Sequence, residues 1–399
     1  MQITLQSGSI AAEVDVPEHA VACAVSGQGP QVLASSLRVP LGLPGLNECA
    51  VAGDRVAIVV DPQMPEPAGT LAQVWDELHA GSLSELSVAI VFPADPHDNS
   101  WASVVDRLPE HLRGQAAIHV HDPAEEAQRH YLASSAGGER IYLSEHVVDA
   151  DLIITVGGIA FDSLLGYRGT SSAVYPALSD AGTIMAACGQ GHSELTPENK
   201  RPLRELVDEV GWLLGTQFSV QVIPNSAGEI GFAYSGAPDK VMQAGQAALK
   251  NHWWYERPDH ADLTIITLPP ALPQLAWKEL GRAVETAGRI TADEGRIVLC
   301  AELPPPESPG LTLLRRCAEP ADLIKPLQLE PGPDTPETLQ LIRSLSQHRV
   351  LLLSNLPAGD VEDLGLLALD SAGELQRIID GANRCCVLQG SAFWTDISG

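Results

Sequence analysis

Short apolar runs rich in β-branched residues alternate with helix-like stretches along most of this chain. Eight runs have the length and composition of buried strands, namely 55–60, 86–92, 117–120, 152–156, 218–223, 263–268, 296–301 and 350–355. Helix-like stretches lie between them, the clearest at 70–80, 203–214, 239–251, 274–287 and 336–347. This alternation is typical of an α/β protein whose mostly parallel sheets are flanked by helices, and we expect that fold class here.

The chain is long enough for two domains. A boundary is expected near 251–262, where a long helical stretch ends and a new strand follows. The sequence therefore predicts an N-terminal α/β domain at 1–255, a C-terminal α/β domain at 256–399, and a cleft between them.

The amino-acid composition disfavours several classes of binding partner. The formal net charge of −27 disfavours binding to nucleic acid or to an anionic membrane, because both require a surface rich in Lys and Arg. No apolar run approaches the roughly 20 residues of a membrane helix. The start MQITLQSGSI lacks the basic and apolar regions of a signal peptide, and the seven cysteines form no CxxC pair. We expect a cytoplasmic protein with a small-molecule substrate.

The segment 151–188 carries the clearest sign of a ligand site. A short apolar strand runs directly into Gly157-Gly158, and a loop after a buried strand is where open α/β sheets bind ligands. A second group of small residues, which let backbone amides approach a ligand, consists of Gly166, Gly169, Thr170, Ser171 and Ser172. Arg168 is the only Lys or Arg in this segment and is a candidate to hold a phosphate or carboxylate.

Other common motifs are missing. The sequence has no GxxxxGK[ST] phosphate loop, no GxGxxG at a strand end and no GxSxG nucleophile turn. His119 and His121 share one face of a strand, which would allow a metal pair, although a strand end facing solvent is the favoured explanation.

The order of five segments resembles the nickel-dependent lactate racemase family, and the resemblance covers nearly the whole chain. VAGDRVAIVVDPQMPEP resembles the family's first strand and loop, and AIVFPADPHDNS resembles its second strand and histidine-containing turn. The remaining matches are IHVHDP, GERIYLSEHVVDADLIITVGGI and ADLTIITLPPALPQLAWKELGRAVETA.

This resemblance implies a reaction. In the family, a nickel-pincer nucleotide linked to a lysine accepts a hydride from the carbon that bears the substrate's hydroxyl group. Two histidines exchange the hydroxyl proton, and the cofactor performs the difficult step. The resemblance therefore implies a racemase or epimerase of a 2-hydroxy acid, or of a related polyol or sugar acid.

Several of the family's functional residues are replaced. The loop aspartate is matched by Asp61, but the arginine three residues later is Met64. The first proton-transfer histidine is matched by His97 and the second falls at Asp162, which is also able to act as a general base. The lysine that would anchor the substrate is matched by Lys278.

The positions that bind the cofactor in the family show the largest differences in this sequence. The tethering lysine falls at Ser172, and no lysine occurs anywhere between residues 151 and 199. The histidine that binds nickel falls at Cys188, and His192 lies four residues further along. The resemblance thus implies a nickel-pincer nucleotide held without a covalent link by the small residues of the glycine segment, with Cys188 or His192 on the metal.

Simpler interpretations remain open for single residues. His97 is also explained as an exposed loop histidine, Asp162 as the cap of a helix beginning at Ser163, Cys188 as a packing thiol, and Lys278 as a solvated lysine. The whole pattern fits an enzyme with an altered site. It also fits a non-catalytic relative that binds a nucleotide or hydroxy acid as a sensor or partner subunit, or an enzyme that holds a phosphate at Arg168 without nickel.

Overall fold

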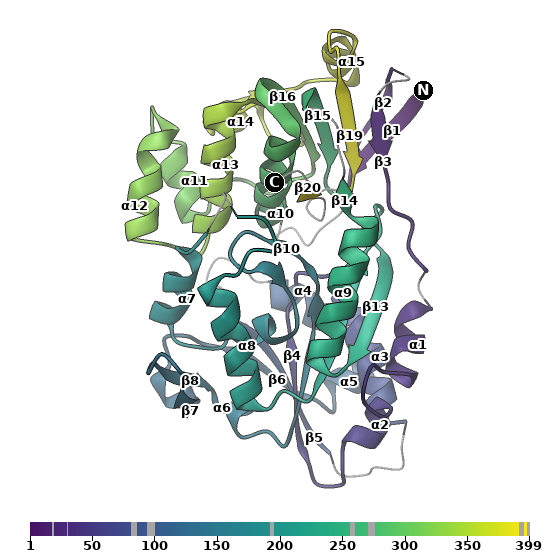
Figure 1. Ribbon diagram of the computed structural model, residues 1–399, viewed down its shortest axis with the longest axis vertical. Coiled ribbons are helices and arrows are strands. Elements are labelled where there is room, and N and C mark those ends of the chain that lie inside the picture. Colours follow the sequence, from purple (N-terminus) through teal and green to yellow (C-terminus); the bar gives the residue numbers. More distant parts are fainter. Residues whose placement is uncertain are drawn as a thin grey trace.

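Two six-stranded sheets, each flanked by helices, form the body of the molecule (Figure 1). This computed structural model describes residues 1–17, 20–29, 31–80, 86–93, 100–191, 195–255, 260–269, 276–390 and 395–396. All eight predicted strands are strands in the structure, with ends that differ by a few residues. The expected α/β class with mostly parallel sheets is confirmed.

The first sheet has the strand order β13-β12-β9-β4-β5-β6, and only β13 runs antiparallel to its neighbour. Its strands are β4 (Arg55–Val60), β5 (Ser87–Pro93), β6 (Ala117–His121), β9 (Leu152–Gly158), β12 (Phe218–Pro224) and β13 (Ile230–Gly236). The central strands are buried on both faces, which explains their continuous apolar sequences. Because β4, β9 and β12 are parallel, their carboxyl ends meet at one edge of the sheet.

The second sheet has the order β18-β17-β16-β15-β19-β3 and is parallel throughout. Its strands are β3 (Val21–Cys23), β15 (Ala261–Thr267), β16 (Thr291–Ala301), β17 (Arg349–Ser354), β18 (Leu367–Ala368) and β19 (Cys385–Gln389). The hairpin of β1 (Gln2–Ser7) and β2 (Ile10–Asp15) shares a buried cluster with Ile265 and Val387. The first strands of the chain therefore lie with the C-terminal sheet, while a domain division at residue 255 stays a prediction.

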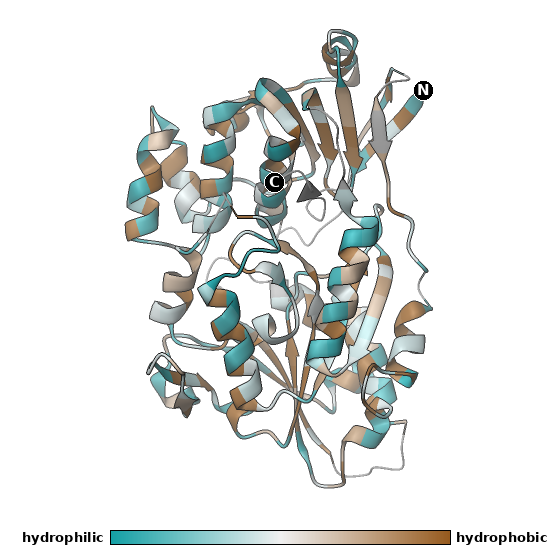
Figure 2. Ribbon diagram, viewed as in Figure 1, coloured by the Kyte–Doolittle hydropathy of each residue, from teal (hydrophilic) through white to brown (hydrophobic). Residues whose placement is uncertain are grey.

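Five helices correspond to the five helical stretches expected from the sequence. They are α3 (Pro67–Leu78), α8 (Pro202–Leu214), α9 (Pro238–His252), α10 (Ala276–Ile290) and α13 (Thr335–Gln347). Figure 2 shows brown, apolar strands inside the molecule and teal, hydrophilic residues along the outer helices. No helix in the described parts of the chain is long and apolar enough to cross a membrane.

Shorter elements complete the fold. The helices are α1 (Val32–Arg38), α2 (Leu46–Cys49), α4 (Ser100–Arg107), α5 (Glu110–Arg113), α6 (Glu145–Val148), α7 (Ala181–Cys188), α11 (Pro309–Leu314), α12 (Ile324–Leu329), α14 (Ala358–Glu362) and α15 (Ala372–Asp380). Paired strands are β7 (Arg129–Ser134) with β8 (Arg140–Ser144), β10 (Ala160–Asp162) with β11 (Gly166–Arg168), and β14 (Trp254–Tyr255) with β20 (Thr395–Asp396). In the described part of the chain, 3₁₀ turns lie at Glu126–Gln128, Thr170–Ala173 and Pro320–Leu323.

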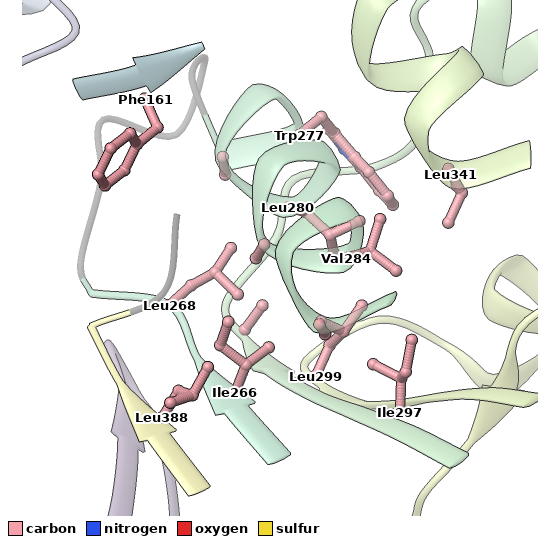
Figure 3. Packing of buried hydrophobic residues seen from close by; sticks show 14 of the residues in the cluster. Phe161, Ile266, Leu268, Trp277, Leu280, Val284, Ile297, Leu299, Leu341 and Leu388 are labelled. Carbon is pink, nitrogen blue, oxygen red and sulfur yellow. The ribbon is translucent and has the colours of Figure 1, made fainter. Parts of the chain in front are cut away.

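Helix α10 connects the second sheet to the glycine segment. Leu280 and Val284 of α10 belong to the same buried cluster as Ile266 and Leu299 of the sheet (Figure 3). Phe161, on β10 beside the glycines, is part of this cluster too. Each fully buried side chain of this size stabilises the packing by about 2 kcal/mol, so α10 is held firmly next to the ligand-site segment.

Helices α10 and α13 approach each other most closely at Gly281. A Cβ atom on Gly281 would lie 2.7 Å from the Cβ of Glu337 and 2.8 Å from its Cα. A side chain at this position would therefore force the two helices apart. Gly288, two turns further along α10, would place a Cβ no closer than 3.6 Å to any neighbour.

We expect Gly281→Ala to lower the free energy of unfolding by about 1–3 kcal/mol, because the extra methyl group overpacks the contact between α10 and α13. The matched control Gly288→Ala should be neutral or stabilise by up to about 1 kcal/mol, since alanine favours a helix over glycine. Urea unfolding measures both variants. Equal stabilities for the two would contradict this account of the helix contact.

Candidate functional site

The glycine segment forms a tight hairpin rather than a helix after β9. Strand β10 pairs with β11 through Ala160 and Arg168, and a 3₁₀ turn over Thr170–Ala173 follows. The interpretation of Asp162 as the cap of a helix at Ser163 is therefore wrong. Asp162 Oδ1 instead accepts hydrogen bonds from the backbone N–H groups of Leu164 and Leu165, at 2.9 and 3.0 Å, which closes the hairpin turn.

The hydroxyl-bearing residues Thr170, Ser171 and Ser172, which follow the hairpin, make contacts within the protein that hold the loop in place. Gly169 has a φ of 129°, a conformation that favours glycine. Its N–H donates to Ser172 Oγ at 2.8 Å, and Ser171 packs against Gly211 of α8. Thr170 is buried with a φ of 51°. A cofactor-binding role for these residues and for Gly166 stays a prediction.

Arg168 forms a buried ion pair with Asp61. Its Nη1 lies 3.1 Å from Asp61 Oδ2, and only 4% of the residue is exposed. Burial and the nearby Arg282 lower the pKa of Arg168, whereas Asp61 raises it. Asp61 directly follows β4 and Arg168 ends β11, so two residues predicted for the substrate site are brought together.

Arg282 of α10 lies at the centre of a second group of charges. Its Nη1 donates to Glu279 Oε1 at 3.0 Å, and its Nη2 donates to Gln63 Oε1 at 2.7 Å. The same Nη2 is 3.6 Å from Asp162 Oδ2. Burial opposes the charge on Arg282, but Glu279 and Asp162 outweigh it and raise the pKa of Arg282. Arg168, Arg282, Asp61 and Asp162 are called the paired-arginine site below.

Lys278 lies one helical turn before Arg282 and is half-buried. Glu337 of α13 is 7% exposed, and burial raises its pKa to about 7 although Lys278 partly offsets this effect. Lys278 is therefore placed beside a buried carboxyl group, next to the paired-arginine site, rather than on a fully solvated face.

A small pocket adjoins the paired-arginine site. Its free volume is about 30 Å³, enough for roughly two water molecules. The residues lining it are Phe161, Asp162, Ser163, Leu195, Pro197, Arg201, Arg282, Glu285, Thr286 and Arg289. Asp162 and Arg282 of the paired-arginine site line this pocket, whereas Asp61 and Arg168 do not. A larger cleft between two domains stays a prediction.

The structure describes only some of the residues predicted to bind a metal or to transfer protons. Cys188 ends α7 and is half-buried, whereas His97 and His192 lie outside the described residues. No group of three His, Cys, Asp or Glu residues in the described parts of the chain is arranged to hold a metal ion. His121 does not face solvent, because it is 3% exposed and its Nε2 lies 2.7 Å from the carbonyl oxygen of Ser179.

Comparison with known proteins gives the family. Residues 9–199 match the model of the lactate racemase N-terminal domain. Residues 9–199 are a lactate racemase N-terminal domain. The solved lactate racemase apoprotein from Thermoanaerobacterium thermosaccharolyticum has a TM-score of 0.82 and 20% sequence identity, covering 99% of this chain and 100% of that one.

A second solved structure shares the fold of this lactate racemase-like chain. It is a structural-genomics protein from Thermotoga maritima, with a TM-score of 0.64 and 12% identity over 88% of this chain and 96% of that one. No curated protein matches the sequence.

The nickel-pincer nucleotide for which the family is known does not fit this chain in its lysine-linked form. Ser172 stands at the tether position, and its hydroxyl accepts the hydrogen bond of Gly169 N–H. A serine has no amine with which to form the thioamide link, and residues 151–199 contain no lysine that could replace it. The same segment carries a buried guanidinium at Arg168.

Sequence analysis missed Arg282, Glu337 and Gln221. Arg282 was detectable, because residues four apart share a helix face and Arg282 lies four after Lys278. Glu337 is brought to the site by the contact between α10 and α13, which no local pattern reveals. Gln221 is a polar residue in an otherwise apolar strand, FSVQVIP, and that signal was present in the sequence.

Stability should depend on pH through Glu337. A folded-state pKa of about 7 lies above the ordinary value for glutamate, so folding favours the protonated form. The contribution is fully present below about pH 4.3 and is lost as pH rises through 7, an effect of about 3 kcal/mol. Glu337→Gln should remove this loss in urea unfolding between pH 4.5 and 8.

The control for this experiment is Glu362→Gln, which changes an exposed glutamate of α14. It should leave the pH dependence of unfolding as in the wild type. A pH dependence in Glu337→Gln as steep as that of the wild type would show that Glu337 is not the group responsible.

Proposed function

We propose that this protein binds the anion of a 2-hydroxy acid, or of a related polyol or sugar acid, and interconverts its stereoisomers as a racemase or epimerase with an altered site. The observation that carries the proposal is the paired-arginine site, in which two largely buried guanidinium groups lie beside carboxylates at the carboxyl ends of β4 and β10. The match to the lactate racemase N-terminal domain and the structural similarity to a solved lactate racemase support the hydroxy-acid class.

The arginines suit the carboxylate of such a ligand. A guanidinium group presents a planar set of donors that matches a carboxylate, and its attraction is strong where water is excluded. Arg168 lies against Asp61 and so restores a positive charge near the position where the family's loop arginine is replaced by Met64. The ligand's carboxylate would bind between Arg168 and Arg282.

Asp162 is placed to handle the ligand's hydroxyl proton. Its Oδ1 is committed to two backbone N–H groups, whereas Oδ2 faces Arg282 across 3.6 Å. A carboxylate oxygen in this position is able to accept a proton from a hydroxyl group bound beside Arg282. Asp162 therefore takes the general-base role. Arg282 is a binding group only, because a guanidinium group stays protonated and has no acceptor.

A second candidate function is ligand binding without turnover, as a sensor or partner subunit. Racemisation moves the hydrogen of the hydroxyl-bearing carbon from one face to the other without net oxidation, so it needs an acceptor that takes the hydride and returns it. In the proposed enzyme, a pincer nucleotide held without a covalent link would supply that chemistry. Ser172 offers no covalent attachment for such an acceptor. The replacement of the lysine by Ser172 is the observation that supports the second candidate. It argues against the family's reaction with a covalently linked cofactor.

Chiral chromatography of D-lactate or L-lactate after incubation with the protein separates the candidates. The protein should be co-expressed with the enzymes that synthesise the pincer nucleotide. The proposed enzyme produces the opposite enantiomer, and Asp162→Asn lowers the rate by at least about 100-fold because the general base is removed. Asp239→Asn, which changes an exposed aspartate of α9, should retain the wild-type rate.

Two further measurements complete the test: the thermal stability of the protein with lactate, and the intact mass of the protein. Thermal stabilisation by lactate without any turnover supports the second candidate, and the absence of both contradicts each of them. An added mass on the wild-type protein that survives denaturation would show a covalent cofactor, and would overturn the conclusion drawn from Ser172.

A further inference from the structure

Gln221 is a buried polar residue at the edge of the paired-arginine site. It lies on β12, where it pairs with Gly157 at the end of β9. Only 1% of the residue is exposed, and its neighbours along the strand are apolar. A primary amide is thus placed inside the molecule, at the carboxyl end of two parallel strands.

Neither polar atom of this amide has a hydrogen-bond partner among the residues that the structure describes. Both Oε1 and Nε2 of Gln221 are buried without one, and so is Nε of Arg168. Buried polar groups are nearly always hydrogen-bonded in folded proteins, because burying them unpaired costs free energy. Two such side chains in one place are therefore a sign of groups kept for a ligand.

The unpaired amide points to the glycine segment. A Cβ on Gly157 would lie 3.6 Å from Gln221 Oε1 and 3.8 Å from Asp61 Oδ2. A Cβ on Gly169, the residue after Arg168, would lie 3.2 Å from the same Oε1. The amide oxygen thus lies beside Gly157, close to the Asp61 carboxylate, and beside Gly169, where Ile159 leaves no room for a Cβ atom.

We propose that Gln221 contacts the ligand's hydroxyl group, while Arg168 Nε contacts its carboxylate. This inference rests on the proposed function and adds the residue that selects the hydroxyl group. The amide has one acceptor and one donor group, and a hydroxyl is able both to donate to Oε1 and to accept from Nε2. A keto oxygen satisfies only Nε2, and a methylene group satisfies neither.

Gln221 therefore distinguishes a hydroxy acid from its keto and deoxy analogues. A site built to hydrogen-bond a hydroxyl rejects an analogue that lacks it, because the buried groups of the site are then left unpaired. We expect lactate to bind at least about 10-fold more tightly than propionate, which differs only by the missing hydroxyl group. Pyruvate should fall between them.

The test is isothermal titration of the full-length protein with D-lactate, L-lactate and propionate. Gln221→Met keeps the length of the side chain and removes both polar groups. It should reduce the preference for lactate to less than about 3-fold, chiefly by weakening lactate binding. The ligand-free variant should unfold at a higher urea concentration than the wild type, since an unpaired buried amide has been replaced by an apolar group.

The matched control is Gln217→Met, just before the same strand. Gln217 is exposed and its amide is satisfied, accepting from Ile153 N–H and donating to the Asp151 carbonyl oxygen. This variant should keep the preference for lactate and unfold at an equal or lower urea concentration. A purely structural role for Gln221 would make the two variants behave alike.

The outcomes separate the two proposals. If the wild type binds lactate and Gln221→Met keeps its preference, or the wild type has no preference over propionate, the assignment of Gln221 is overturned and the proposed function stands. If the wild type binds neither lactate enantiomer, both the proposed function and the assignment of Gln221 fail. If Gln221→Met does not fold, Gln221→Leu is used in its place, and the same results are expected.

Discussion

Two guanidinium groups held away from water are the constraint around which this site is arranged. A buried charge is tolerated only when it is paired and hydrogen-bonded, so Arg168 requires Asp61 and Arg282 requires its carboxylate neighbours. These pairs join residues from the end of β4, from the glycine hairpin and from α10. The packing of α10 on the second sheet therefore determines the geometry at the edge of the first.

Most of the regular fold was predictable, because buried parallel strands are marked by β-branched residues and their helices by amphipathic spacing. β4 was predicted with its observed bounds, Arg55–Val60. β3 could not be assigned to the second sheet, because its partner β19 lies more than 350 residues further along the chain. The first hairpin forms a two-stranded sheet of its own, and its packing against the second sheet has no local signature. The β10–β11 hairpin was also missed, since each of its strands has only three residues.

The site was predictable in its location and only partly in its chemistry. A strand running into glycines indicated the region, and Asp61 and Arg168 were both named as ligand-binding candidates. Their mutual ion pair and the role of Arg282 depend on tertiary contacts between residues 61, 168 and 282, which have no local signature. The replacement of a tethering lysine by Ser172 and the presence of a buried arginine together indicate a site that still favours an anion but has changed how it holds any cofactor.

Titration of lactate against the wild type and Arg282→Lys tests the central claim most directly, because lysine keeps the charge and loses the planar donor set. The account predicts saturable binding of D-lactate or L-lactate to the wild type, and binding at least about 10-fold weaker in the variant. Arg377→Lys, which changes an arginine of α15 far along the chain, should bind as the wild type does. Wild-type protein that binds no lactate, or an Arg282→Lys variant that binds it equally well, would contradict the account.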